Sequence, residues 1–494
     1  MFENKKILDL IKKYKIIWSL ESTESLLNWD LETFMPMESY QERGLVLNNI
    51  SKIKRNIYYE MKSMMSSAEK EKDLNEAEIA FLRELKREII FSESMSSDFY
   101  KKFSILITKS TIKWREAKIK SDYKIFEPIL KDVLDLTIKK TEYLDNNKNP
   151  YDILLDIYSE GLTMNDVDNI FLPLSKELPK IRENIIDGGY FVTNHPLENI
   201  KYDQKLMEDV NLEIVKLLDI PFSKFRFTIS THPFTVKIGP NDIRITTRYE
   251  GINFKNTMYS TIHECGHAIY SMQQNPELEF TPLAHRDSID ASTELGGFSE
   301  SQSRFWENII GKSYKFISDI YPILLSKLSF INNYTEDDIY RYVNIIKPTP
   351  IRVDSDEVNY NLHIIIRYEI EKELILGKLN TNELPNRWNE LMEKYIGIQP
   401  KTDSEGVLQD IHWSKGMFGY FPTYALGNVI SAMIWSKLKK DLFNMSYPDI
   451  KRWLYENIHK YGKIYIPKDL ALLVFKEPIN HEKFIEYLSN KYIK

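Results

Sequence analysis

The chain has 494 residues, of which 43% are hydrophobic, and its 66 basic and 72 acidic side chains give a formal net charge of −6. A chain of this length and apolar content can bury a large core without covalent cross-links. The negative balance argues against a nucleic-acid partner, because affinity for phosphate backbones comes mainly from clustered positive charge. A single cysteine excludes an internal disulfide and suits a reducing compartment.

The N-terminal segment, MFENKKILDLIKKYKIIWSL, indicates an amphipathic helix rather than a secretory signal. Lysines interrupt each of its apolar runs, and no small-residue cleavage site follows. The longest purely apolar run is LALLVF, from Leu470 to Phe475, which is far shorter than the roughly 20 residues needed to span a bilayer. We therefore expect a cytoplasmic protein that has no membrane partner.

A helical pattern dominates residues 1–222, without a repeat or a low-complexity linker. The clearest example is the segment 74–90, whose apolar residues recur at helical spacing, namely Ile79, Leu82, Leu85 and Ile89. Turn-forming residues interrupt the pattern at a few places, namely around Pro36, before Tyr151 and at Asp187.

The residue pattern changes at Ser223, where three short segments alternate β-branched and aromatic residues with polar ones. These segments are FRFTIS, FTVKIG and DIRITTRY, separated by THP and GPN, and they predict three strands within residues 223–250. Helical periodicity returns at Asn256 and continues to the end. The sequence therefore predicts a mainly α protein with one small three-stranded sheet. We expect a single unit in which residues 1–222 are helical, residues 223–250 form the sheet and residues 251–494 are helical again.

The pentapeptide His263-Glu264-Cys265-Gly266-His267 fits the pattern His-Glu-x-x-His. Residues four apart stack on one face of a helix, so His263 and His267 can reach the same zinc ion. Glu264 then lies beside the ion, where its carboxylate can take a proton from a water molecule. Cys265 is two residues from each histidine and points about 200° away on a helix. We therefore expect Cys265 to be a small buried side chain without a chemical role.

A catalytic zinc ion takes three protein ligands and keeps one position open. The pattern that places a third histidine six residues after the second fails here, because Gln273 and Tyr270 occupy its histidine and glycine positions. A glutamate on a second helix is the other common solution. The candidates are Glu277, Glu279, Glu294, Glu300 and Glu307.

The surroundings of these glutamates differ. The stretch NPELEF is turn-like, so Glu277 and Glu279 are expected to be exposed. Spacing alone leaves the choice between Glu294 and Glu300 open. Glu300 belongs to a segment that we expect to form a partly buried helix, and Arg304, one turn later, could orient its carboxylate.

Over nearly its whole length the chain resembles a known family, the thermostable zinc carboxypeptidases of the Taq type from bacteria and archaea. Two segments resemble the family before the metal motif, LLNWDLETFMP (Leu26 to Pro36) and PYDILLDIYSEGLT (Pro150 to Thr163). The signature blocks then follow in order: His232-Pro233-Phe234; Asp242, Arg244 and Thr246; the pentapeptide; Ile351 to Asp356; and Gly406, Gln409, Asp410, His412 and Trp413.

The resemblance implies that Glu300 is the third zinc ligand, because the run Ser299-Glu300-Ser301-Gln302-Ser303-Arg304 matches the family's His-Glu-Ser-Gln-Ser-Arg. Two departures accompany this match. Ser299 replaces the family's histidine, which removes a contact near the metal or the substrate. The segment 284–298, AHRDSIDASTELGGF, is also longer than in the family and could reshape the rim of the pocket.

The resemblance also implies roles for other side chains. Glu264 would be the general base, and His412 with Tyr424 would stabilise the oxyanion, with Tyr420 as a further candidate. Arg352 is the first choice for binding the terminal carboxylate of the substrate, and Arg244 is the second. The matched blocks add substrate-binding candidates, namely His232, Asp242 and Gln409.

These observations predict a zinc metallocarboxypeptidase of broad specificity that releases residues from free peptide C-termini, with cobalt as a possible substitute for zinc. The family implies a large helical zincin-type fold with a deep groove, and a homodimer. Two alternatives remain open at this point. One is an oligopeptidase on the same scaffold, and the other is an inactive homologue that binds peptide or metal.

Overall fold

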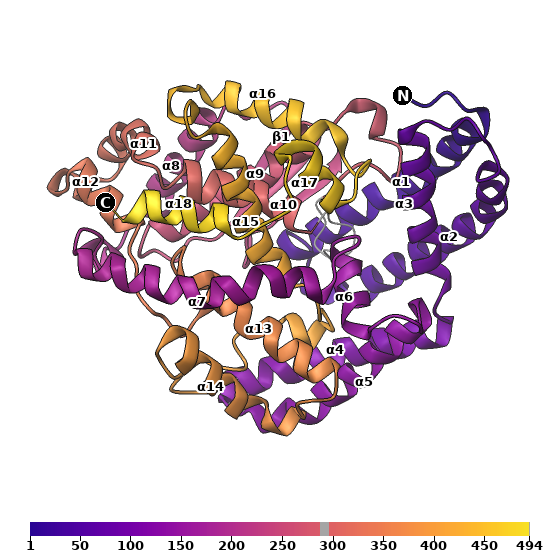
Figure 1. Ribbon diagram of the computed structural model, residues 1–494, viewed down its shortest axis with the longest axis horizontal. Coiled ribbons are helices and arrows are strands. Elements are labelled where there is room, and N and C mark those ends of the chain that lie inside the picture. Colours follow the sequence, from indigo (N-terminus) through magenta and orange to yellow (C-terminus); the bar gives the residue numbers. More distant parts are fainter. Residues whose placement is uncertain (287–295, 494) are drawn as a thin grey trace.

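The computed structural model describes residues 1–286 and 296–493 (Figure 1). Helices fill the N-terminal region, as the periodicity predicts. They are α1 (Lys5–Thr33), α2 (Tyr40–Ala68), α3 (Glu76–Glu93), α4 (Ser97–Lys120), α5 (Glu127–Leu144), α6 (Pro150–Tyr158), α7 (Met164–Gly188) and α8 (Gln204–Leu217). The expected interruptions near residues 36, 150 and 187 are confirmed, and further ones lie at 69–75, 94–96 and 121–126.

The sheet is confirmed as three short strands, β1 (Phe225–Ile229), β2 (Thr235–Gly239) and β3 (Asp242–Thr247). Its order is β1-β3-β2, with β1 parallel and β2 antiparallel to β3. Because side chains alternate along a strand, Thr235 and Lys237 share a face with their partners Ile245 and Ile243. Arg244 points to the opposite face.

Helices return after the sheet and continue to the C-terminal end. They are α9 (Lys255–Met272), α10 (Gly297–Arg304), α11 (Tyr314–Lys327), α12 (Glu336–Val343), α13 (Asn359–Ile375), α14 (Leu384–Ile396), α15 (Pro422–Leu438), α16 (Tyr447–Asn457), α17 (Pro467–Phe475) and α18 (Glu482–Tyr492). A π-helical turn, Phe305–Ile310, directly follows α10.

The centre of the molecule is built from α9, α10, α13 and α15 (Figure 1). Helix α9 packs on β2 and β3, α10 packs between α9 and α15, and α13 packs on α7, α14 and α15. One large hydrophobic core includes residues of all four helices. The side chains of α10 are more buried than the sequence predicts, since Phe298, Gln302 and the following Phe305 are all fully inaccessible to solvent.

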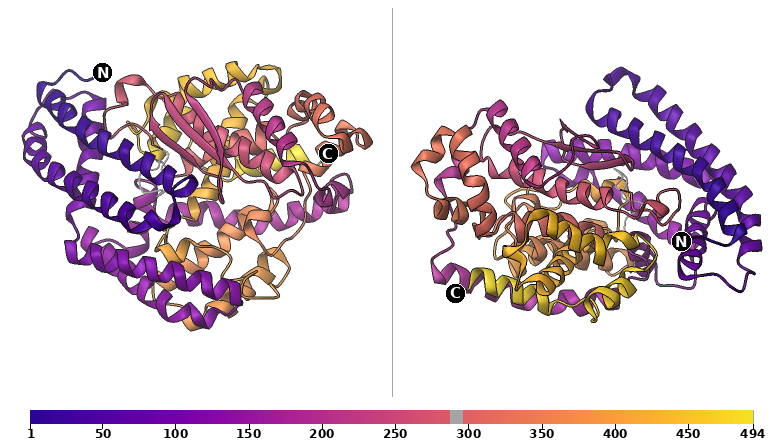
Figure 2. Two further views of the ribbon diagram at one scale, coloured as in Figure 1. Left: turned by 180° about the vertical axis from the view of Figure 1, so that it is seen from behind. Right: turned by 90° about the horizontal axis from the view of Figure 1, so that it is seen from above.

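Helices α1, α2 and α3 form a group with a hydrophobic core of its own, which also takes in Leu278, Leu283 and Ile464 from the catalytic half of the chain. Seen from behind, the strands lie beside α1 (Figure 2). One expectation for α3 is wrong: Ile79 is 58% exposed, although Leu82, Leu85 and Ile89 are buried. Phe81 lies on the buried face with these three residues.

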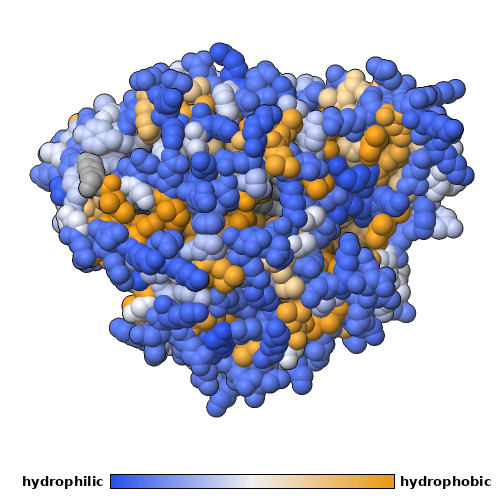
Figure 3. All heavy atoms as spheres, in the orientation of Figure 1, coloured by the Kyte–Doolittle hydropathy of each residue, from blue (hydrophilic) through white to orange (hydrophobic). Residues whose placement is uncertain are grey.

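The surface drawn in Figure 3 is mostly hydrophilic, with apolar residues in separate patches. Within the described ranges, every helix is too short or too polar to cross a lipid bilayer.

Candidate metal centre and active site

The two histidines of the pentapeptide and one glutamate converge between α9 and α10. Nε2 of His263 lies 3.9 Å and Nε2 of His267 lies 3.6 Å from Oε2 of Glu300. One ligand atom from each of the three residues lies within 4.8 Å of the other two. The structure thus brings together His263, His267 and Glu300, which are the residues that the sequence singles out as metal ligands.

Two glycines allow the helices to approach closely enough for this convergence. A Cβ atom at position 266 would lie 2.6 Å from the Cα atom of Ser303 on α10. A Cβ atom at position 427, on α15, would lie 2.6 Å from Cγ of Glu300. Gly266 therefore sets the spacing between the two ligand helices, and Gly427 sets the space around the carboxylate.

The imidazole of His263 is oriented by a second glutamate, Glu307. Oε2 of Glu307 lies 2.8 Å from Nδ1 of His263, which leaves Nε2 of the histidine facing His267 and Glu300. Glu300, Arg304 and Glu307 share one helix face because they are spaced by four and then three residues. Glu307 lies in the π-helical turn, a feature often found at functional sites.

Arg304 lies between the two glutamates, as its position one turn after Glu300 predicts. Its Nε donates to Oε1 of Glu300 at 2.7 Å, and one terminal nitrogen donates to Oε2 of Glu307 at 3.1 Å. Burial alone would raise the pKa of Glu300, but Arg304 and the two histidines outweigh it and hold the pKa at about 2. The carboxylate of Glu300 is therefore ionised and fixed in direction, as a metal ligand must be.

Glu264 and Cys265 occupy different surroundings on α9. The carboxylate of Glu264 is buried and accepts a hydrogen bond of 2.6 Å from the hydroxyl of Thr235 in β2. Burial raises the pKa of Glu264 above its ordinary value. Cys265 is completely buried, as expected, and burial raises the pKa of its thiol.

The other glutamates considered as ligands lie elsewhere. Glu277 is exposed and pairs with the N-terminal amine. The expectation that Glu279 is exposed is wrong: it is 5% exposed and accepts a hydrogen bond of 2.7 Å from the buried Lys237. Glu294 lies outside the described residues, as does most of the longer segment 284–298.

Ser299 faces the protein interior. Its side chain is fully buried, and its hydroxyl lies 3.4 Å from Nε2 of His285, which is buried as well. The ring of His285 stacks on Tyr270 of α9, with ring centres 4.5 Å apart. The space beside position 299 is therefore filled by an imidazole from the segment that precedes α10.

The residues expected to stabilise an oxyanion lie side by side. Nε2 of His412 is 3.3 Å from the hydroxyl of Tyr424 at the start of α15, and the ring of Tyr420 stacks on that of His412. Burial lowers the pKa of His412 to about 3 and raises that of Tyr424 well above its ordinary value. Both side chains are therefore neutral at pH 7 and can donate a hydrogen bond without carrying charge.

Arg352 is buried beside this pair in a network of charges. Its Nε and one terminal nitrogen donate to Oδ1 of Asp410 at 3.1 and 2.8 Å. Arg367 donates to the other oxygen of Asp410 at 2.7 Å. Burial would raise the pKa of Asp410, but the two guanidinium groups outweigh it and hold the pKa far below its ordinary range. Gln409 accepts from the backbone N–H of Arg352 at 2.8 Å and from Arg367 at 2.7 Å.

A continuous series of buried contacts joins the metal centre to His412. The guanidinium of Arg304 lies over the ring of Tyr360 at 4.4 Å from its centre. Arg352 donates to the hydroxyl of Tyr360 at 2.8 Å and lies 5.1 Å from the ring centre of Tyr424. These cation–π contacts and hydrogen bonds place the two halves of the site on one rigid framework.

The remaining predicted residues belong to the sheet and stand apart from this framework. Arg244 forms a two-pronged ion pair with Asp242, with both distances 2.8 Å, and its guanidinium lies 4.4 Å from the ring centre of Trp29 on α1. His232 is exposed in the turn between β1 and β2, and its backbone carbonyl accepts from Thr246. Among the described residues, no hydrogen bond or ion pair links these side chains to the metal ligands.

Sequence reasoning missed Thr235, which contacts Glu264, and three residues of α13 that shape the site. Tyr360, Arg367 and Glu371 are all on α13, and each is buried against residues that lie between eight and 220 positions away along the chain. The usable signal was the position of Arg367 and Glu371 among Ile364, Ile365, Ile366 and Ile370, because a charge buried among apolar side chains needs a partner.

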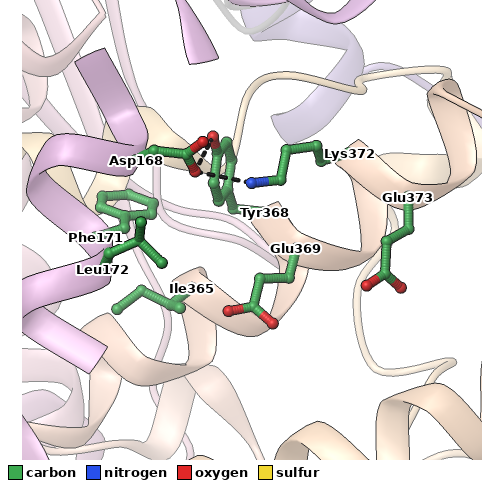
Figure 4. Close-up of a pocket in the computed structure, with 8 residues that line it drawn as sticks. All are labelled: Asp168, Phe171, Leu172, Ile365, Tyr368, Glu369, Lys372 and Glu373. Carbon is green, nitrogen blue, oxygen red and sulfur yellow. Dashed lines mark hydrogen bonds and ion pairs between the residues drawn. The ribbon is translucent and has the colours of Figure 1, made fainter. Parts of the chain in front are cut away.

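An outer hollow of about 190 Å³ lies between α7 and α13 (Figure 4). It is lined by Asp168, Phe171, Leu172, Ile365, Tyr368, Glu369, Lys372 and Glu373. Asp168 accepts hydrogen bonds from Tyr368 and Lys372 across it. None of the residues predicted to act in catalysis lines this hollow.

Comparisons with known proteins identify the family of this chain. The family model described as "Carboxypeptidase Taq (M32) metallopeptidase" matches residues 9–492. Thermostable carboxypeptidase 1 of Pyrococcus furiosus is 40% identical and covers 100% of this chain and 99% of its own length. Carboxypeptidase 1 of Bacillus subtilis is 33% identical and covers 99% and 97%.

Solved structures give the same result. A structure of the Pyrococcus furiosus carboxypeptidase, with 40% sequence identity, superposes with a TM-score of 0.95 and covers 100% of both chains. Because the family match spans almost the whole chain and these relatives cover it fully, the chain belongs to the M32 family of carboxypeptidase Taq metallopeptidases and is a metallocarboxypeptidase.

Proposed function

We propose that this enzyme is a zinc-dependent carboxypeptidase of broad specificity, which releases amino acids one at a time from free peptide C-termini. The observation that carries the proposal is the convergence of His263, His267 and Glu300 beside the buried Glu264. The resemblance described above and the names of the relatives support the direction of cleavage.

The three ligand residues fit a tetrahedral metal ion. Bonds of about 2.0–2.1 Å in tetrahedral geometry put neighbouring ligand atoms about 3.4 Å apart. The separations of 3.6 and 3.9 Å between Glu300 and the two histidines need only small adjustments to reach that value. We propose zinc, with cobalt as a possible substitute. When bound, the ion supplies a Lewis acid that polarises a carbonyl group and makes water more acidic.

Glu264 is proposed as the general base. Its carboxylate takes the proton of the attacking water and passes it to the leaving nitrogen of the peptide. The hydroxyl of Thr235 holds one of its oxygens, Oε2, at 2.6 Å, which leaves the other oxygen for the water. The raised pKa of Glu264 makes it a stronger base than an exposed carboxylate.

His412 and Tyr424 are proposed to stabilise the oxyanion. Because His412 is neutral, only one of its ring nitrogens carries a hydrogen. If Nε2 donates to the hydroxyl of Tyr424, that hydroxyl is free to donate its own hydrogen to the substrate oxygen. Tyr420 supports this arrangement by stacking on the imidazole.

Arg352 is proposed to attract the terminal carboxylate of the substrate, and Arg244 remains the second choice. Two buried guanidinium groups, those of Arg352 and Arg367, share the single carboxylate of Asp410, so the region keeps excess positive charge. Gln409 would orient Arg352, and Asp242 would orient Arg244. His232, in the turn of the sheet, would contact substrate backbone.

Mass spectrometry of one peptide in two forms tests the proposal. The free acid should give a ladder of C-terminal truncations, and the same peptide with an amidated C-terminus should stay intact. Glu264→Gln should keep its metal but lose about 10²–10⁴ in kcat. Equal cleavage of both peptides, or cuts inside the chain, would instead identify an oligopeptidase. Wild-type protein that binds zinc and cleaves neither form would identify an inactive homologue.

We also propose that the chain acts as one peptidase unit in the cytoplasm and forms a homodimer, as the resemblance implies. The single buried cysteine is compatible with a reducing compartment. Native mass spectrometry tests the assembly: a mass near twice the 58.5 kDa of the chain is expected, and a monomer at micromolar concentration would contradict it.

A further inference from the structure

The strongest observation outside the metal centre concerns Glu371 on α13. Its carboxylate is completely buried and accepts three hydrogen bonds. The indole N–H of Trp413 donates to Oε1 at 2.8 Å. The backbone N–H of Gly419 and the hydroxyl of Tyr151 donate to Oε2 at 2.8 and 2.9 Å. No step proposed above uses this carboxylate, although burial of a carboxylate strongly disfavours folding unless its partners compensate.

Two of these donors are next to residues that are proposed to act on the oxyanion. Trp413 directly follows His412, and Gly419 directly precedes Tyr420. Glu371 therefore holds both ends of the segment 412–420, which we name the donor loop because it carries two of the residues proposed to act on the oxyanion. Tyr424, the third, lies one turn further along the chain.

The same face of α13 also holds the chain just before the donor loop. Arg367, one turn before Glu371, donates to Asp410 at 2.7 Å and to Gln409 at 2.7 Å. Arg367 is as completely buried as Glu371. Two successive turns of α13 thus contact the chain at Gln409, Asp410, Trp413 and Gly419.

Helix α6 closes the loop from the other side. Gly419 has a φ of +87°, in the left-handed region, and a Cβ atom there would lie 2.8 Å from the backbone of Leu154. Tyr151, the third donor to Glu371, is one turn before Leu154 on the same helix. The donor loop is therefore held between α6 and α13, with Glu371 as the group that both sides share.

We propose that Glu371 is a positioning residue for the reaction, which acts by fixing His412 and Tyr420 relative to Tyr424. This inference rests on the proposed function, because it assigns a role through residues that the proposed mechanism places at the oxyanion. It predicts that Glu371 affects the rate of the chemical step, while the metal centre and substrate binding remain intact.

The two N–H donors require an acceptor oxygen at each end of this side chain. A glutamine has the same shape, but one end of its amide is an NH₂ donor. If that end faces Trp413, two N–H donors meet, and if it faces Gly419, two N–H donors meet there instead. Tyr151 can rotate its hydroxyl, but neither N–H group can change its role. Glu371→Gln must therefore release one end of the donor loop.

The primary experiment compares Glu371→Gln with a matched control, Glu369→Gln. Glu369 is on the same helix but lines the outer hollow (Figure 4). Its carboxylate accepts a hydrogen bond from Tyr395. For Glu371→Gln we expect kcat to fall about tenfold to a hundredfold. This fall should not exceed the fall in kcat caused by removing one oxyanion donor. KM should stay within about twofold, and metal content should stay at one ion per chain. Glu369→Gln should match the wild type in all three.

A double-variant cycle separates positioning from a general structural effect. If Glu371 acts through Tyr424 and its neighbours, Glu371→Gln should cost little further activity once Tyr424→Phe has been made. If the two losses instead multiply, Glu371 acts independently of the oxyanion donors and the inference is overturned. Wild-type kcat in Glu371→Gln overturns it as well.

Tyr151→Phe keeps the experiment decisive if Glu371→Gln does not fold. This variant removes one of the three donors and keeps the ring, so kcat should fall by a smaller factor with metal content unchanged. Wild-type kcat in this variant, together with an unfolded Glu371→Gln, would assign Glu371 to folding alone and overturn the inference. Failure of the proposed function looks different, because Tyr424→Phe and His412→Ala would then leave peptide release unchanged.

Discussion

The imidazole of His263 shows how one side chain can determine whether a metal site forms. A neutral histidine binds a metal through whichever ring nitrogen lacks a hydrogen. The carboxylate of Glu307, 2.8 Å from Nδ1, accepts the hydrogen there and leaves the lone pair on Nε2, which faces Glu300. The negative charge also makes the imidazole a better ligand.

Removal of this carboxylate should weaken metal binding. We expect Glu307→Ala to lower zinc affinity about tenfold to a hundredfold, as measured by competition with a chromophoric chelator. Glu183→Ala, at an exposed position on α7, is the control and should bind zinc as the wild type does. Unchanged affinity in Glu307→Ala would show that the histidine keeps its tautomer without this partner.

The buried side chain of His459 affects the stability of the protein in acid. This histidine is buried between Gln273 and Gln302, and burial, assisted by the nearby His285, lowers its pKa to about 3. Between pH of about 6.5 and about 3, the unfolded chain therefore binds a proton that the folded chain excludes. The buried neutral imidazole of His459 therefore contributes fully to the stability of the folded state above a pH of about 6.5. This contribution is lost as the pH falls through the window.

The size of this effect can be measured on metal-free protein. One such proton changes the free energy of unfolding by up to about 1.4 kcal/mol per pH unit. Urea unfolding at pH 6 and pH 5 should show a smaller loss of stability for His459→Gln than for the wild type. The same pH dependence in both proteins would contradict the buried neutral state of His459.

Helix α10 illustrates how packing at the level of elements creates the site. Its eight residues, Gly297–Arg304, lie between α9 and α15, and the glycines at 266 and 427 bring both neighbours within contact of its backbone or of Glu300. The position of the Glu300 carboxylate therefore depends on the spacing of three helices, and not only on its own rotamer.

An added methyl group on α15 tests this dependence. Gly427→Ala places a Cβ atom 2.6 Å from Cγ of Glu300, so α10 and α15 must separate. We expect a loss of about 1–3 kcal/mol in the free energy of unfolding and weaker zinc binding by calorimetry. Gly44→Ala is the matched control, because no atom lies within 4 Å of its added Cβ on α2. That control should bind zinc normally and should not lose stability.

The elements were more predictable from the sequence than the site's supporting contacts. Periodicity of 3.6 or two residues identifies α3, α9 and the three strands, because burial of one face repeats locally. The spacing of four residues likewise indicates that His263 and His267 share a face. In contrast, the contact of Glu371 with Trp413 joins residues 42 positions apart, and no local pattern specifies it. Glu279 was misassigned for the same reason, since its partner Lys237 is also 42 positions away.

At the scale of the whole molecule, the group α1–α3 is joined to the catalytic half through residues 276–286. Leu278 and Leu283 lie in the core of this group, and Trp18 of α1 donates to Glu279 at 3.1 Å. Glu279 also accepts from Lys237 of β2, so one buried carboxylate connects α1 to the sheet. Arg286 pairs with Glu21 of α1 at 3.4 Å.

Loss of this carboxylate should loosen the attachment. Glu279→Ala removes an ion pair with the buried ammonium group of Lys237 and the hydrogen bond from Trp18, for which we expect a loss of about 1.5–3 kcal/mol in the free energy of unfolding. Urea unfolding monitored by tryptophan fluorescence measures it. Glu116→Gln, which removes the two surface ion pairs of Glu116 with Lys113 and Lys120 on α4, is the control and should cost less than about 1 kcal/mol. Similar curves for both variants would show that the connection through Glu279 contributes little.

The attachment of α1–α3 to residues 276–286 has a consequence for the retention of the metal. In sequence, residues 273–296 join the helix that carries His263 and His267 to the helix that carries Glu300. Some of this connection is anchored in the N-terminal group, outside the main core. Partial melting of α1–α3 would therefore free the tether between the ligand helices while the main core is still folded. A chelator should then strip the ion fastest at temperatures just below the main unfolding transition, so that heat inactivation would begin with metal loss before the main core unfolds.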